Sequence, residues 1–188
     1  VKRSGARHYT TYQVIGWRAY RGGDALVASE TREPDSRWFG AEPQLLVEHR
    51  GPGVDALIDR IDAAVQRYPW GTTYHLWPGP NSNTFVAFVA REVPELGLDL
   101  PPTAIGKDYL GPLTFVAPAP SGSGWQASLW GLAGVTVARE EGLELNLLGL
   151  GIGVDINDAR LRLPGLGLWP RSVPLRATGS AARPGPAG

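Results

Sequence analysis

The stretch Trp77-Pro78-Gly79-Pro80-Asn81-Ser82-Asn83-Thr84-Phe85 leads directly into the apolar run Val86-Ala87-Phe88-Val89-Ala90. Its two prolines have fixed φ angles, and the glycine between them can adopt a positive φ, so we expect a tight, stiff turn. The apolar run is too hydrophobic for a surface helix, and it stops before Pro94. These residues therefore predict a buried helix over about residues 83–93 that begins immediately after the turn.

Three polar residues, Asn81, Ser82 and Asn83, lie where this helix begins. All three residue types accept hydrogen bonds from backbone N–H groups at a helix start. The N-terminal end of a helix also carries a partial positive charge, which stabilises an anion or an activated nucleophile. Two interpretations of Ser82 therefore stay open. It is either a plain helix N-cap, or a nucleophile beside which Asn81 and Asn83 bind the substrate.

The composition excludes several classes of function. The 188 residues suffice for one domain with its own core, and 18 basic residues balance 18 acidic ones. This balance gives no electrostatic case for binding nucleic acid or an anionic membrane surface. There is no cysteine, which excludes disulfides, thiolate zinc sites and a Cys nucleophile. His8, His49 and His75 are too scattered for a good metal site, and we predict neither a metal nor a cofactor.

The two ends of the chain carry separate expectations. The chain starts with Val1 and contains no Met, so we expect a processed product or a fragment whose signal or anchor precedes Val1. After Trp169 the chain is rich in Pro, Gly and Ala and has no acidic residue, which is typical of a segment that cannot order itself. We expect one α+β domain over residues 1–168 and a tail over residues 169–188 that a partner surface holds.

The remaining pattern predicts an α+β fold with one antiparallel sheet, two packed helices and long Pro/Gly-rich loops. Apolar residues at helical spacing predict the first helix over residues 54–67, and Tyr68-Pro69 ends it. We expect strands over residues 9–17, 44–48 and 72–77, and loops over residues 21–43 and 94–109.

The last third of the chain contains apolar runs interrupted by glycine. Residues 126–137, 143–154 and 160–163 predict two or three antiparallel strands; if they form a sheet of their own, a mostly β arrangement is the alternative fold. Three leucines at 143, 145 and 147 alternate with Glu144 and Asn146, which predicts one buried apolar face and one polar face.

Two charged groups admit more than one interpretation. Lys107-Asp108 and Glu140-Glu141-Glu144 could act as acid/base groups or cation ligands, but we favour a surface turn and a solvated strand face. The positions of Trp125, Trp130 and Trp169 also stay open. They either pack inside the domain or line a surface that faces a membrane or a partner, and several exposed tryptophans would favour an interface.

Several long motifs resemble a bacterial family, domain-of-unknown-function family 3750. They are the stretch 77–85, Gly16-Trp17, residues 100–109 and residues 140–150, and the likeness runs from about residue 9 to about residue 167. The resemblance implies a hydrophobic anchor or signal, and a His-Thr-Trp or His-Ser-Trp segment, upstream of Val1. It therefore implies a place in the cell envelope, on the periplasmic side. It implies no activity, because the family has no established one.

The shorter stretch Asn81-Ser82-Asn83-Thr84-Phe85 is similar to the Asn-Cys-Asn-(His/Thr)-Phe motif of circularly permuted papain-like hydrolases, the NlpC-type and PPPDE groups. In those folds a Cys heads a buried helix, and a His from an earlier strand acts as base. Ser82 takes the position of the Cys. A serine hydroxyl does not ionise near neutral pH, so it needs a base, either His75 or a His upstream of Val1.

Two functions follow from these observations. The first is a non-catalytic papain-like domain that serves as an accessory or structural subunit of a membrane-associated envelope complex. The alternative is a serine-dependent amidase, peptidase or acyltransferase acting on cell-envelope substrates. An enzyme requires an open cleft over Ser82 and an imidazole nitrogen within about 3 Å of its hydroxyl. A scaffold would instead bury Ser82 and bond it only to backbone.

Overall fold

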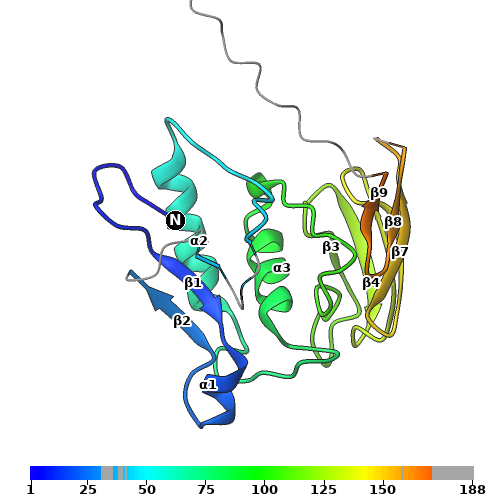
Figure 1. Cartoon of the computed structure of the whole chain (residues 1–188), viewed down its shortest axis with the longest axis horizontal. Coiled ribbons are helices and arrows are strands. Elements are labelled where there is room, and N and C mark those ends of the chain that lie inside the picture. Colours follow the sequence, from blue (N-terminus) through cyan, green and yellow to red (C-terminus); the bar gives the residue numbers. More distant parts are fainter. Residues whose placement is uncertain (31–35, 38–39, 41, 158, 171–188) are drawn as a thin grey trace, which may run out of the picture.

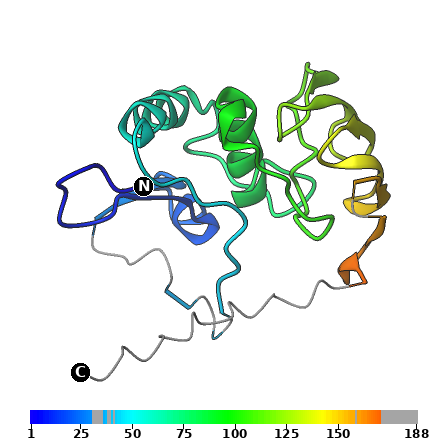
Figure 2. The same ribbon diagram turned by 90° about the horizontal axis from the view of Figure 1, so that it is seen from above.

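The computed structural model of the chain describes residues 1–30, 36–37, 40, 42–157 and 159–170. Its fold is α+β, which confirms the expected class. The first part contains strands β1 (Thr11–Val14) and β2 (Leu26–Ser29) and helices α1 (Gly16–Tyr20), α2 (Val54–Arg67) and α3 (Ser82–Glu92). Figure 1 shows α3 in the middle, between α2 with β1–β2 on one side and a large sheet on the other. Figure 2 shows the same order from above.

Both long helices lie where the sequence predicts them. α2 has the expected bounds, and it buries Ile58, Ala64 and Val65 from its apolar stripe. α3 begins and ends one residue earlier than expected, because Asn81 rather than Ser82 is its N-cap. The turn before α3 contains Gly79 at φ +143°, a conformation that favours glycine, as the turn prediction requires.

The two sides of α3 bury different apolar groups. Phe85, Val89 and Val93 pack with Tyr68 and Val14 from the α2 and β1 side. The Tyr68 ring lies edge-on to Phe85 at a centroid distance of 5.0 Å and to Phe88 at 5.4 Å. A second buried cluster joins Ala87 and Ala90 of α3 to three residues of the segment that follows the helix. These are Leu98, Leu100 and Ala104. The helix is therefore buried, as its composition predicts.

Several short strands differ from prediction. β1 is shorter than expected and is followed by α1 from Gly16. The predicted loop 21–43 contains β2, which pairs antiparallel with β1 from Thr11↔Ser29 to Val14↔Leu26. The structure has no strand over residues 44–48 or 72–77. Strand propensity needs a neighbouring strand, and residues 72–77 instead fold back on the turn, with the His75 N–H donating to the Pro80 carbonyl at 2.8 Å.

The last third of the described chain forms a sheet of its own, so the expectation of one sheet is wrong. Its strands pair antiparallel in chain order and are β3 (Val116–Pro118), β4 (Gly124–Leu129), β5 (Ala133–Ala138), β6 (Gly142–Leu147), β7 (Leu150–Asp155), β8 (Arg160–Leu163) and β9 (Gly167–Trp169). A short helix η1 (Pro94–Leu96) and an irregular segment precede it. The sheet has more strands than predicted because the apolar runs contain tight turns, with Gly131 at φ +74° and Gly149 at φ +84°.

The orientation of this sheet is the reverse of the prediction. On β6, Glu144 and Asn146 are buried, whereas Leu143, Leu145 and Leu147 are exposed. We call the side that faces α3 the inner face and the opposite side the outer face. The inner face is polar because it packs against a segment that presents Asp99, Lys107 and Asp108 rather than apolar side chains.

Candidate functional site

Asn81 connects three segments at the start of α3. Its Oδ1 accepts hydrogen bonds from the N–H groups of Asn83 at 2.9 Å and Thr84 at 3.1 Å. Its Nδ2 donates to the carbonyls of Leu76 at 3.0 Å and Ile105 at 3.1 Å. Asn81 is buried, and both of its amide protons are used within the chain. This geometry makes it the residue that holds the turn, the helix and the following loop together.

The neighbours of Asn81 reinforce the same junction. The Thr84 hydroxyl accepts from the Asn81 N–H at 3.1 Å and donates to the Gly106 carbonyl at 2.7 Å, which completes a capping box. Asn83 Nδ2 donates to the Ile105 carbonyl at 2.8 Å. Gly106 has φ +95°, and a Cβ there would lie 2.2 Å from Asn81 Nδ2. Asn81 and Asn83, which the sequence suggested as substrate-binding residues, therefore use their amide groups in hydrogen bonds within the chain.

Ser82 lies beside this junction but takes no part in it. It is the first residue of α3 and is exposed. It borders a groove of about 520 Å³ between β1, α1 and α3, whose lining is largely aromatic and aliphatic, including Tyr12, Trp17 and Tyr74. Among the described residues, no hydrogen bond to the Ser82 hydroxyl is found and no histidine lines the groove. The structure therefore provides the open cleft that an enzyme requires, without an imidazole among the described lining residues. The buried, backbone-bonded Ser82 expected of a scaffold is wrong, since Ser82 is exposed.

The three histidines lie in different surroundings. The His75 side chain is exposed and does not border the groove. His8 lines a separate cavity of about 320 Å³ near Val1, together with Arg3 and Asp62. His49 is exposed, with Nε2 at 3.1 Å from the Leu96 carbonyl. Within the described part of the chain, no three His, Asp or Glu side chains form a group that could bind a metal ion.

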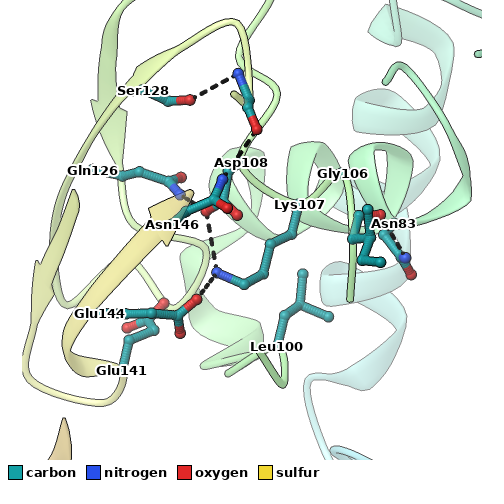
Figure 3. A network of polar contacts seen from close by, with 12 residues as sticks. Asn83, Leu100, Gly106, Lys107, Asp108, Gln126, Ser128, Glu141, Glu144 and Asn146 are labelled. Carbon is teal, nitrogen blue, oxygen red and sulfur yellow. Dashed lines mark hydrogen bonds and ion pairs between the residues drawn. The ribbon is translucent and has the colours of Figure 1, made fainter. Parts of the chain in front are cut away.

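The inner face of the sheet carries a buried network of charged groups, which Figure 3 shows. Lys107 Nζ lies 2.6 Å from Glu144 Oε1, as an ion pair rather than an aligned hydrogen bond, and 3.1 Å from Asp108 Oδ1. Gln126 on β4 donates to Asp108 and accepts from Arg91 of α3. The expected surface turn and solvated strand face are wrong for Lys107, Asp108, Glu141 and Glu144, since all four are buried.

Arg162 on β8 is the centre of this network and is 0% exposed. Its Nε donates to Glu144 at 2.8 Å, and its two terminal nitrogens donate to the Asp99 carboxylate at 2.8 and 2.7 Å. A further bond of 2.7 Å goes to the Leu100 carbonyl. Gly153 lies between Glu144 and Arg162 in the sheet register, so no side chain separates them. The guanidinium thus joins the sheet to the preceding segment.

The acid/base properties of the network follow from its burial. Desolvation lowers the pKa of Arg91 to about 10, against the attraction of Asp108 and Glu141. Desolvation also acts to lower the pKa of Lys107, but the carboxylates of Asp108 and Glu144 outweigh it and raise that pKa. Burial raises the pKa of Asp99, against the effect of Arg162. These groups bond to one another, so the arrangement is suited to holding two layers together rather than to chemistry on a substrate.

A second set of buried polar groups forms hydrogen bonds on the same face. Glu141 is buried and accepts from the Ser121 N–H at 2.9 Å and from the Ser121 hydroxyl. Asn146 Nδ2 donates to the Gly131 carbonyl at 3.1 Å, and the Gly131 N–H donates to Ser128. Gln126, Ser128 and Asn146 are buried hydrogen-bonding positions within the sheet. Glu140 is exposed.

The outer face of the sheet is apolar in every described row. Paired positions in successive strands run Trp125, Val137, Leu143, Val154, Leu161 and Trp169. A second row runs Ala127, Val135, Leu145 and Ile152, and a third runs Leu129, Ala133, Leu147 and Leu150. The six side chains of the first row are between 42% and 66% exposed. Trp125 and Trp169 stand at opposite ends of that row.

One sequence signal marks which face is which. In β7, Gly151 and Gly153 alternate with Leu150, Ile152 and Val154. A Cβ on Gly151 would lie 2.6 Å from Glu144 Oε1 and 3.1 Å from Pro102, so Gly151 lies on the face that the segment around Pro102 approaches closely. The alternating glycines, rather than the leucines, therefore indicate the inner face.

Comparison with known proteins gives the family and no activity. The chain belongs to the family described as "Protein of unknown function (DUF3750)", which matches residues 1–109. This match ends before β3, short of the expected limit near residue 167. No curated protein and no solved structure matches the chain, so the resemblance to papain-like hydrolases gains no support. None of the helices described is long and apolar enough to cross a membrane.

Proposed function

We propose that this member of the DUF3750 family is a non-catalytic accessory subunit that binds an apolar partner surface through the outer face of its sheet. The observation that carries the proposal is the row from Trp125 to Trp169, together with the rows through Leu145 and Leu147 beside it. These rows contain only apolar residues over the described strands β4–β9. A face of this kind gains free energy when a partner removes it from water.

The size of the face supports an interaction role. The large apolar side chains that are exposed on the outer face, each between 42% and 66% exposed, together present on the order of 1,000 Å². The largest apolar patch on a typical monomer is about 300–600 Å². Single exposed leucines need no explanation, but a continuous patch of this size marks a binding surface. Trp125 and Trp169, 66% and 56% exposed, add the residue type that is enriched at interfaces.

The polar groups of the molecule support a structural rather than catalytic role. Asn81, Asn83 and Thr84 are engaged in the cap of α3, and Lys107 and Arg162 are paired with carboxylates. The proposed place of the subunit is a membrane-associated assembly of the bacterial cell envelope, a prediction that rests on the family resemblance. The expected contact of a partner with residues 169–188 concerns a segment that lies, apart from Trp169 and Pro170, outside the described residues.

The test is gentle extraction of the intact, full-length protein from its own membranes, followed by measurement of its native mass. We expect it to migrate as a complex larger than one chain. A double variant, Leu145→Gln with Ile152→Gln, places two polar side chains on the outer face and should dissociate the complex. Leu45→Gln is the matched control, because Leu45 is 71% exposed and lies outside the sheet. If the extracted wild-type protein has the native mass of a single chain, as the double variant should, the proposal is contradicted.

The alternative function keeps one specific observation in its favour, which is that Ser82 is exposed beside the 520 Å³ groove. In this alternative, Ser82 is the nucleophile of a serine-dependent amidase, peptidase or acyltransferase, with a histidine as base. The same preparation tests it with a serine-directed phosphonate probe and a Ser82→Ala control. An accessory subunit should show no labelling that depends on Ser82. Labelling that Ser82→Ala abolishes would favour the enzyme.

A further inference from the structure

We infer that the surface covering the outer face is a second copy of this chain, packed sheet against sheet. The inference rests on the proposed function, and it names the partner of the face described there. Five kinds of observation carry it: the area of the face, its composition, the antiparallel strand order of the sheet, its short edges and the charge of the chain.

The area is what a stable dimer needs. If each copy contributes on the order of 1,000 Å², the two copies together bury about 2,000 Å², which falls between the standard interface of roughly 1,600 Å² and the larger interfaces of obligate homodimers. A much smaller patch would support only a transient contact. The outer face is therefore large enough to hold two copies together without a contribution from the rest of the molecule.

The composition favours an identical partner. Homodimer interfaces are more apolar than other interfaces, and the rows of the outer face contain no described polar or charged side chain. Such a face offers no hydrogen bond or ion pair by which to select a different protein. A second copy matches it automatically, because a two-fold axis brings the same apolar surface from both sides.

The antiparallel pairing of the seven strands is the architecture that packs face to face in β-sandwiches. Two antiparallel sheets pack about 10 Å apart with strand directions within roughly 30° of each other, as in a β-sandwich. β6 is the middle strand of the order β3-β4-β5-β6-β7-β8-β9, and Leu145 lies at its outer-face centre. A two-fold axis near Leu145 would give the greatest overlap of the two faces.

The edges of the sheet do not compete with this arrangement. The edge strands β3 and β9 have three residues each, so they offer few unpaired backbone groups to another strand. Net charge also favours association of copies, because 18 basic and 18 acidic residues leave no long-range repulsion between them. A lipid surface would instead be favoured by basic side chains among the rows, and these rows contain none.

The experiment measures the mass of the purified full chain in solution by sedimentation equilibrium. We expect two copies for the wild type and for Leu45→Gln. The Leu145→Gln, Ile152→Gln variant should raise the dissociation constant by more than about a hundredfold, because it buries four polar side chains without partners in each dimer. Circular dichroism and urea unfolding confirm that the variant is folded.

A cross-link gives a second readout that does not depend on a destabilising change. The chain has no cysteine, so Leu145→Cys introduces a single thiol at the centre of the outer face. We expect oxidation to join two copies through this thiol, while Leu45→Cys yields no comparable product. A dimer that neither forms this cross-link nor responds to the double variant would associate through another surface and would overturn the inference.

The remaining outcomes separate this inference from the proposed function. A monomer that nevertheless co-purifies with a different chain, and loses it in the double variant, overturns the second copy but supports the accessory subunit. A monomer that instead floats with neutral phosphatidylcholine vesicles overturns the second copy and assigns the face to lipid. A monomer that binds neither overturns both proposals.

Discussion

The two layers on either side of α3 are held to it by different interactions. Toward α2, Phe85 and Val89 contact an apolar core around Tyr68. Toward the sheet, Arg91 of the same helix donates to the Pro118 carbonyl at 3.0 Å and to Gln126, and the Lys107 and Arg162 ion pairs lie nearby. One helix thus forms an apolar interface on one side and contributes to a charged one on the other.

The difference shows what each kind of interface specifies. An apolar core accepts many arrangements of similar volume, and its free energy follows the area removed from water. A buried charged interface gains little net free energy, but removing one partner leaves another charge buried and unpaired. The polar inner face therefore fixes the position of the sheet relative to the first part of the chain. The apolar residues of the strands lie on the outer face.

The largest expected effect comes from the charged interface. Arg162→Met leaves Glu144 and Asp99 without their guanidinium, and we expect the free energy of unfolding to fall by about 3–5 kcal/mol. Arg67→Met is the matched control, because Arg67 pairs with Glu92 at 2.7 Å with side chains 56% and 37% exposed. An exposed pair contributes about 0–1 kcal/mol. Urea unfolding of both variants measures the difference, and equal losses would contradict a structural role for the buried network.

A smaller effect distinguishes the apolar core from the outer face. Val89→Ala removes two methyl groups from the buried core and should cost about 2 kcal/mol of unfolding free energy. Val137→Ala makes the same change on the outer face, where the side chain is 60% exposed, and should cost less than about 1 kcal/mol. Unfolding is measured at high dilution, where copies are separate. A larger loss for Val137→Ala under these conditions would show that the outer face is covered within a single chain.

The smallest effect is a dependence on alkaline pH. The carboxylates around Lys107 raise its pKa in the folded protein above the ordinary 10.5, despite desolvation. The resulting stability is present below pH 10.5 and is lost as pH rises through the folded pKa. Between these two values the folded state keeps a proton that the unfolded state has released, so stability falls as pH rises. The stability deficit of Lys107→Met relative to wild type should therefore narrow above pH 10.5.

Urea unfolding from pH 8 upward checks this prediction. Tyr12, whose pKa desolvation and a bond to Asp62 raise to about 12, changes stability in the same direction but equally in both proteins. Its contribution cancels in the comparison. A deficit that stays constant over the whole pH range would show that the Lys107 proton has no stabilising partner in the folded state.

Local signals determined the two long helices and the turn before α3. The spacing of Val54, Leu57 and Ile58 defines α2, and the Pro-Gly-Pro turn with Asn81 defines the start of α3, since these depend on residues within a few positions of each other. The α+β class follows from the same signals. Ser82 was placed at the correct helix end, but the sequence could not distinguish it from its neighbour Asn81 as the cap.

The tertiary structure decided everything that depends on a distant partner. Strand alternation shows that β6 has two faces, but the face that lies inward depends on Lys107 and Arg162, which are 37 and 18 positions away from Glu144. Residues 44–48 have strand propensity and no neighbouring strand, so they form none. The sequence alone determined the two long helices and the turn before α3, whereas strand pairing and burial were set by contacts between residues far apart in the chain, which no local pattern encodes.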